Sequence, residues 1–275
     1  NNMLNQFTMI LPEVLLASIA MIMQIIGVYC KGCTRWVAST TSVLALGLVC
    51  YLLFNVPAFE VGFSGSFVIS SSIFLFKALV LGLTLMSLVI YHDLTKIAKT
   101  PLRMEFVTLV LLSTVGVFIS ISARDLILLF CGLELQALAG YALAAFNSKE
   151  TKSSEAGLKY FVLGALVSCL MLLGISFLYG FSGSMKFNDI RIALNGDLNI
   201  GLVVGAVLLL TGILFKLSAA PLHVWTPDVY EGAPIAAVTY FSVAQKVGML
   251  VVLINIVGSM IGEYKPISVE IIKIV

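Results

Sequence analysis

Apolar residues in this chain form long continuous runs that are separated by short polar connections. A helix that crosses the hydrocarbon core of a bilayer needs about 20 mostly apolar residues. Runs of about this length lie at residues 9–29, 36–55, 68–91, 106–122, 126–146, 157–180, 200–220 and 235–257. The pattern therefore predicts an all-α polytopic membrane protein with about eight transmembrane helices.

The composition strengthens this prediction. Hydrophobic residues make up 60% of the chain and charged residues 11%, and the mean hydropathy is +1.09, whereas soluble domains carry about 25% charged residues. A net charge of +2 gives no indication of nucleic-acid binding. The five cysteines are an odd number and lie mostly in apolar runs, so they form no disulfide framework. Cys30 and Cys33 form one isolated C-x-x-C pair, a weak metal or redox signal.

The polar connections are predicted to be loops, and their charges orient the bundle. Clusters of Gly and Ser at 62–66 and 180–184 and the polar stretch 186–199 are typical of loops. With the N-terminus outside, seven Lys and Arg residues lie in inner loops and four in outer loops, which fits the positive-inside rule. The inner set is Lys31, Arg35, Lys96, Lys99, Arg103, Lys149 and Lys152, and the outer set is Arg124, Lys186, Arg191 and Lys265.

The connection 221–234 is unusual because it contains Pro221, Pro227 and Pro234. Proline removes a helical donor and clashes with the preceding turn. Free backbone groups at membrane depth are tolerated only against protein or a water-filled cavity. Residues 200–234 therefore have two interpretations: a broken helix that lines a wet space, or an ordinary interfacial loop with belt aromatics.

Charged side chains lie inside several predicted spans. Each costs roughly 2.5–3.5 kcal/mol at the bilayer centre on the insertion scale. Glu134 lies eight residues from the nearest edge of its run, about 12 Å deep, and Lys246 has about eleven residues on either side. Neither side chain can reach an interface, so both indicate a function.

Three further lysines in apolar runs have a structural interpretation beside the functional one. Lys216 lies about one turn before the first proline, and its ammonium could snorkel to the inner interface. Its position beside the break favours the functional interpretation. Lys159 follows Glu155 by four residues, the spacing of an ordinary surface pair. Lys77 could instead satisfy backbone groups or a partner subunit.

Lysines combined with one glutamate suit proton transfer. Burial lowers the pKa of a lysine and a nearby carboxylate raises it. A lysine whose carboxylate partner moves away can therefore release its proton near neutral pH, whereas arginine stays protonated. The residues alone predict a membrane protein that handles protons.

Two stretches carry a resemblance to a known family: EAGLKYFVLGA at 155–165 and LFKLSAAPLHVWTPDVYEGAP at 214–234. They resemble the antiporter-like membrane subunits of NADH:quinone oxidoreductase, respiratory complex I, and within these subunit 2, called subunit N in bacteria. The Pro12–Glu13 pair, the lysine of the third run and the Gln245–Lys246 pair fit as well. The resemblance covers essentially the whole chain.

This resemblance implies two five-helix repeats of opposite topology, each with a broken helix. On that basis residues 1–105 form an N-terminal three-helix segment, 106–257 one antiporter-like repeat with a proton half-channel, and 258–275 a short C-terminal tail. The second repeat and its twelfth-helix lysine are absent from the sequence. That half is a separate chain, is lost, or lies outside the present sequence.

The resemblance also implies roles. Glu134 and Lys216 would form a switchable ion pair, Lys246 would receive or pass the proton, Lys159 would serve proton uptake, and His223 would relay or gate near the break. The chain itself would bind no flavin, iron–sulfur cluster or metal. NADH, FMN, iron–sulfur clusters and quinone would belong to partner subunits, in a mitochondrial inner membrane or a bacterial plasma membrane.

Two other functions stay open. A shortened subunit of this kind could be a non-pumping scaffold of the membrane arm, although a scaffold would be expected to lose its buried charges. Multisubunit cation/proton antiporters contain related subunits, and the resemblance to the first repeat fits them nearly as well. The closer match to subunit 2 favours complex I.

Overall fold

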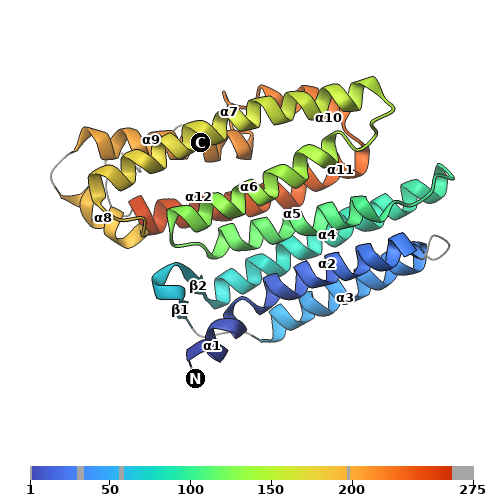
Figure 1. The fold of residues 1–275 in the computed structure, drawn as a ribbon, viewed down its shortest axis with the longest axis horizontal. Coiled ribbons are helices and arrows are strands. Elements are labelled where there is room, and N and C mark those ends of the chain that lie inside the picture. Colours follow the sequence, from blue (N-terminus) through green and yellow to red (C-terminus); the bar gives the residue numbers. More distant parts are fainter. Residues whose placement is uncertain (1, 30–33, 56–58, 197–198, 262–275) are drawn as a thin grey trace.

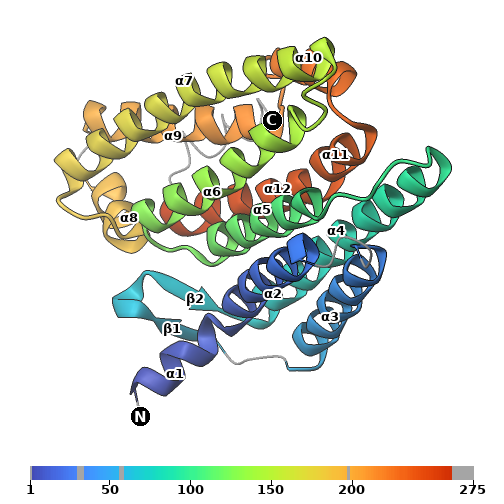
Figure 2. The ribbon, with the colours of Figure 1, turned by 45° about the vertical axis from the view of Figure 1, so that its right-hand side comes forward.

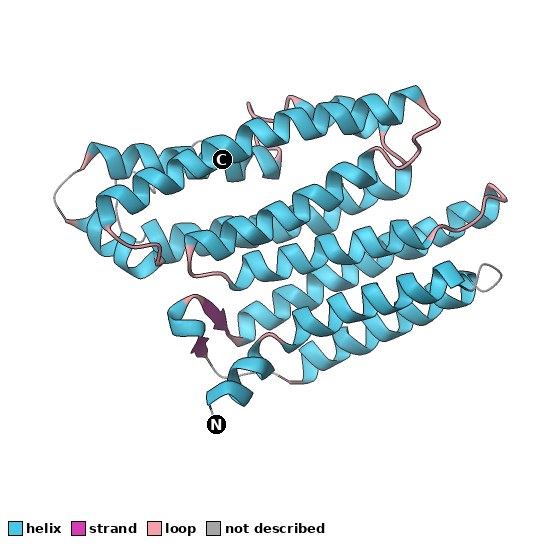
Figure 3. Cartoon of the chain, viewed as in Figure 1, coloured by secondary structure: helices cyan, strands magenta, loops and turns pink. Residues whose placement is uncertain are grey.

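The computed structural model describes residues 2–29, 34–55, 59–196 and 199–261. Long helices run side by side from α2 and α3 at one edge to α7 and α9 at the other, and a two-stranded hairpin lies at one end of the bundle (Figures 1 and 3). In the described part, seven helical segments are long and apolar enough to cross a membrane, and a shorter apolar helix covers Ala38–Phe54. The predicted all-α polytopic fold is confirmed.

The N-terminal part contains helices α1 (Asn2–Met9), α2 (Leu11–Tyr29), α3 (Thr34–Phe54) and α4 (Ser71–Ile97), with strands β1 (Glu60–Gly62) and β2 (Phe67–Ile69) before α4. The remaining helices are α5 (Met104–Ser122), α6 (Leu126–Ala144), α7 (Thr151–Ser182), α8 (Phe187–Asn195), α9 (Ile200–Leu217), α10 (Trp225–Gly232), α11 (Ile235–Tyr240) and α12 (Lys246–Ile256). Two π-helical segments, η2 (Phe241–Gln245) and η3 (Val257–Ile261), flank α12.

Two predicted loops contain regular structure. The cluster 62–66 belongs to a hairpin in which β1 pairs antiparallel with β2, so the third span begins at Ser71 and not at residue 68. The stretch 186–199 contains α8, whose buried residues Phe187, Ile190 and Leu194 follow helical spacing. This amphipathic pattern is too short to stand out as a hydrophobic run.

The helix of the seventh predicted span is interrupted, as the broken-helix interpretation predicts, while the wet space beside it stays a prediction. The interpretation as a loop with belt aromatics is wrong for Trp225, which is buried. α9 ends at Leu217, and Ser218 adopts a left-handed conformation (φ 62°) that stops the helix. After the connection, α10 packs on α7, where the Trp225 ring stacks on Tyr160 with centroids 4.5 Å apart. Figure 2 shows α9 and α10 one after the other along the length of α7. The interruption therefore lies beside the middle of α7.

Small residues let α7 and α9 approach closely. A Cβ atom added at Gly174 would lie 2.8 Å from the Gly205 carbonyl oxygen, and one at Gly205 would lie 2.9 Å from that of Gly174. Contacts of this kind are a common means of packing helices in membranes. They fix the level at which α9 ends against α7.

Candidate functional site

Glu134 lies on α6, whose position is fixed at its first turn and along its length. The Asp125 side chain caps α6 by accepting hydrogen bonds from the backbone N–H groups of Ile127 (2.9 Å) and Leu128 (3.3 Å). A Cβ at Gly132 would lie 2.9 Å from the backbone N of Ser120, so α5 and α6 are in direct backbone contact. Glu134 therefore projects from a rigid helix pair on the side that faces α7 and α9.

Glu134 and Lys216 form an ion pair in the structure. The Lys216 Nζ lies 3.1 Å from Glu134 Oε1 and 3.3 Å from the Leu133 carbonyl oxygen. Ser168 Oγ on α7 donates to the same carboxylate oxygen at 2.5 Å. The side chains of Lys216 and Glu134 are 10% and 25% exposed. Lys216 therefore turns into the protein, and the snorkelling interpretation is wrong.

The pair lies where the last turn of α9 meets the middle of α7. Ser168 is 14 residues from the C-terminal end of α7 and 17 residues from its start. A charge in this position is far from both ends of the bundle, which is where a bilayer would offer water or headgroups. The two opposite charges satisfy one another in a region where either alone would be costly.

A small cavity lies next to the pair, toward α12. Lys216, Gln136, Tyr141, Tyr160 and Gln245 contribute to its walls, and its volume of about 10 Å³ has room for about one water molecule. The Gln136 side-chain oxygen is buried and accepts no hydrogen bond from the described residues. The cavity thus lies between Lys216 and Gln245, the residue that directly precedes Lys246.

Lys246 lies at the start of α12, directly after the π-helical segment η2. Its ammonium lies 5.5 Å from the centre of the Tyr230 ring, a cation–π arrangement. Among the described residues it forms no ion pair, and its side chain is only half-buried. The structure therefore places Lys246 beside Tyr230, directly after Gln245 and, among the described residues, without a carboxylate partner.

Lys159 lies at the protein surface, as its interpretation as a surface pair with Glu155 predicts. Its side chain is 43% exposed and forms ion pairs with Glu155 at 2.8 Å and Asp228 at 2.7 Å. The surface pair at helical spacing is therefore present, and Asp228 on α10 extends it. A second pair, between Lys152 and Glu231 at 2.9 Å, also joins α7 to α10.

His223 lies in the interruption between α9 and α10 and is exposed. Its carbonyl oxygen accepts a hydrogen bond from the Thr226 backbone at 3.0 Å. Within the described ranges the imidazole has no hydrogen bond or ion pair. The structure thus places His223 near the break but does not bring its side chain to Lys216 or Lys246.

A second buried ion pair joins α2 to α4. Lys77 is fully buried and pairs with Glu13. The rings of Phe67, Phe74 and Phe118 lie 5.2–5.8 Å from the Lys77 ammonium. This lysine is satisfied inside its own chain, and neither backbone groups nor a partner subunit is needed for it.

The sequence analysis did not identify four partner residues: Glu13 for Lys77, Ser168 for Glu134, Asp228 for Lys159, and Gln136 beside Lys216. Each lies far along the chain from the residue it serves, and only folding brings them together. The Pro12–Glu13 pair at the start of an apolar run was the one available signal.

Among the described residues no group of three or more His, Cys, Asp or Glu side chains could hold a metal ion. The pair Cys30 and Cys33 lies outside the described residues.

Comparison with known proteins identifies related chains. NADH-quinone oxidoreductase subunit N of Rickettsia felis is 48% identical over 269 residues, which cover 97% of this chain and 58% of the relative. The chain thus spans little more than half the length of this relative. A chain in the structure of respiratory complex I from Thermus thermophilus with bound aureothin matches with a TM-score of 0.74 and 27% identity, over 89% of this chain and 52% of that chain.

A chain of the Mrp complex from Dietzia sp. DQ12-45-1b has the same fold, with a TM-score of 0.71 and 20% identity, over 95% of this chain and 51% of that chain. The family model described as NADH:quinone oxidoreductase/Mrp antiporter, transmembrane, matches residues 123–274, more than half of the sequence. The matched segment holds Glu134, Lys216 and the interruption between α9 and α10. The chain belongs to the NADH:quinone oxidoreductase/Mrp antiporter transmembrane family.

Proposed function

We propose that this chain acts as a subunit N of a bacterial respiratory complex I and carries a proton half-channel coupled to quinone reduction. The observation that carries the proposal is the Glu134–Lys216 pair, held beside an interrupted helix and far from both ends of the bundle. The 48% identity to a subunit N from Rickettsia felis supports the choice of complex I.

The pair can work as a switch because the Lys216 ammonium is much more stable with the Glu134 carboxylate beside it than without it. While Glu134 lies beside it, the Lys216 ammonium is stabilised in a low dielectric. If the carboxylate is drawn away, the ammonium becomes costly and its proton is favoured to leave. A water molecule in the adjacent cavity, between Lys216 and Gln245, would give that proton a path toward Lys246.

The remaining residues have assigned roles within the same proposal. The cluster of Lys159, Glu155 and Asp228 exchanges protons with solvent at one end of the path, since these groups are exposed. Lys246 receives the proton next to Tyr230, and His223 relays or gates at the interruption. Residues 106–257 make up the half-channel, and residues 1–105 are the helical segment beside it.

Redox chemistry belongs to partner subunits in this proposal. NADH, FMN, iron–sulfur clusters and quinone bind elsewhere in the complex, and this chain contributes proton transfer and membrane-arm contacts. The relatives named above are bacterial, so we place the chain in a bacterial plasma membrane; nothing favours the mitochondrial alternative.

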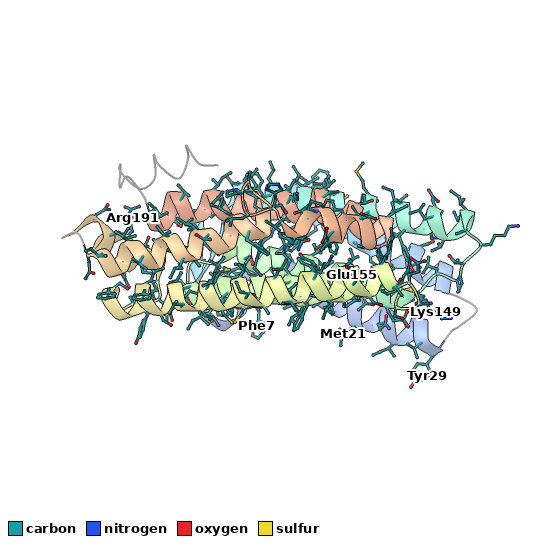
Figure 4. All side chains as sticks on the ribbon, turned by 90° about the horizontal axis from the view of Figure 1, so that it is seen from above. Phe7, Met21, Tyr29, Lys149, Glu155 and Arg191 are labelled. Atoms are coloured by element: carbon teal, nitrogen blue, oxygen red, sulfur yellow. The ribbon has the colours of Figure 1, made fainter. Side chains whose placement is uncertain are left out.

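The test uses the complete complex in membrane vesicles, with Lys216→Met and Lys246→Met compared separately with wild type. We expect each variant to assemble, and to lose proton pumping that is driven by NADH oxidation. The matched control is Lys149→Met, an exposed lysine at one end of the bundle (Figure 4). Normal pumping by both variants would favour a scaffold.

A cation/proton antiporter is the second candidate, because the matching family also includes Mrp antiporters. Sodium or potassium flux from reconstituted protein, without quinone reduction, would support it. Flux that requires NADH oxidation would support complex I instead.

A further inference from the structure

A hollow of about 660 Å³ lies at the end of the bundle where the hairpin, the connection between α5 and α6, α8 and the end of α12 meet. Its polar wall carries Arg124, Lys186 and Arg191. Figure 4 shows Arg191 at this end of the bundle and Lys149 at the opposite end. Three of the four basic residues of the predicted outer loops are thus gathered around one hollow.

The backbone around Arg124 is held from two sides. Its N–H donates to the Ser66 carbonyl oxygen at 2.9 Å, and its own carbonyl oxygen accepts from the Phe187 N–H at 3.1 Å. The hairpin and α8 are therefore tied to the same residue. The hollow is a defined feature of the fold, because its walls are joined by backbone hydrogen bonds.

Arg124 carries a charge that the described residues do not neutralise. The side chain is half-buried, and among these residues it forms no ion pair. Burial lowers the pKa of Arg124, and no carboxylate acts to raise it. Because arginine stays charged in proteins, a half-buried guanidinium without a carboxylate partner favours an anion from outside the described residues.

The start of α8 adds to the positive character of the hollow. Lys186 occupies the cap position, and no side chain caps the helix. The first N–H groups of a helix lack intrahelical acceptors and favour anions. The lining carries three basic residues and one carboxylate, Asp189, which accepts a hydrogen bond from Ser184 Oγ at 2.6 Å.

The same hollow also has an apolar side. Phe59, Val61 and Ile254 line it and are 69%, 53% and 58% exposed. α5 ends at Ser122 and α6 begins at Leu126, so the hollow lies at the level where the apolar helices end. Cationic groups above exposed apolar side chains at this level match the headgroup and acyl chain of a phospholipid.

We propose that this hollow binds an acidic phospholipid, with its phosphate at Arg124, Lys186 and Arg191 and its acyl chain along Ile254. The proposal does not depend on proton translocation, since none of these residues belongs to the candidate proton path. The proposal gives Arg124, Lys186 and Arg191 a common ligand, which the charge balance between inner and outer loops does not require.

Native mass spectrometry of the full chain in dodecyl maltoside tests the proposal, with dioleoyl phosphatidylglycerol and dioleoyl phosphatidylcholine as probes. We expect phosphatidylglycerol to bind at least tenfold more tightly than phosphatidylcholine, and Arg124→Gln to reduce that preference about fivefold, because each cation near the surface contributes about a fivefold effect. Arg124→Lys keeps the charge and should retain most of the preference. Lys149→Gln, at the opposite end, should leave it unchanged.

A variant without Arg124 could fail to fold, so Lys186→Gln combined with Arg191→Gln provides a second test on exposed side chains. Equal binding of the two lipids by wild type would overturn the proposal, as would full retention of the preference by the double variant. The soluble competitor sn-glycerol 3-phosphate distinguishes a lipid from a free anion. Displacement of phosphatidylglycerol at equal concentration would show a general anion site and overturn the assignment to a lipid.

Discussion

Replacing Glu134 by glutamine removes the negative charge of the Glu134–Lys216 pair with little change in shape. Glutamine keeps a side-chain oxygen that can accept the hydrogen bond from Ser168 Oγ. The substitution therefore leaves packing in place and leaves the Lys216 ammonium without its carboxylate. Its effect on the free energy of unfolding isolates the charge interaction.

The magnitude follows from the geometry. Opposite unit charges 3.1 Å apart attract by about 5 kcal/mol at an effective dielectric constant of about 20. Removal of one partner from a buried pair costs about 3–5 kcal/mol. Because Glu134 is 25% exposed, we expect a loss near the lower end, about 3 kcal/mol.

Titration with SDS in mixed micelles measures this loss, and a double-mutant cycle assigns it. Lys216→Met alone should also destabilise the protein, whereas Glu134→Gln with Lys216→Met should cost less than the sum of the two. We expect a coupling energy of about 2–3 kcal/mol. The control pair is Glu155 with Lys159, which is exposed and should couple by less than about 1 kcal/mol. A coupling energy below about 0.5 kcal/mol for Glu134 and Lys216 would refute the reasoning.

Other substitutions test the surrounding structure by the same titration. Lys77→Met should cost about 3–5 kcal/mol because it leaves the buried Glu13 carboxylate unpaired, and adding Glu13→Leu should recover much of the loss; additive losses would contradict this. Gly174→Leu should cost about 1–3 kcal/mol or more by separating α7 from α9, whereas Gly180→Leu meets open space and should be neutral; equal effects would contradict the close packing. Asp228→Asn should cost less than about 1 kcal/mol, since its ion pair is exposed, and a loss above about 2 kcal/mol would show that this pair holds α10 in place.

The course of the chain through the bundle was largely predictable because hydrophobic length decides it. Each predicted span coincides with a helical segment, although their ends differ by several residues. α8 and the hairpin were missed for a physical reason. Their hydrophobic faces are only a few residues long, and contacts with α5, α7 and η3, distant in sequence, stabilise them.

The charged residues of the candidate site were predictable from the sequence, but the residues that they contact were not. Glu134 and Lys216 stood out because each alone is costly in a bilayer. Their pairing across 82 positions is a property of how α6 and α9 pack. Glu13 was not identified as the partner of Lys77, since a carboxylate in the first turn of a helix is also explained by the helix dipole. For Lys159 the sequence left two interpretations, and the structure shows the exposed surface pair with Glu155 in the first third of α7.

Infrared difference spectroscopy of the assembled complex tests the central claim, that the contact between Glu134 and Lys216 opens and closes during turnover. Spectra are recorded between the oxidised and the NADH-reduced states of wild type and of Glu134→Gln. The account predicts a carboxyl band in the wild-type difference spectrum that is absent from the variant. Identical difference spectra for the two proteins would contradict it.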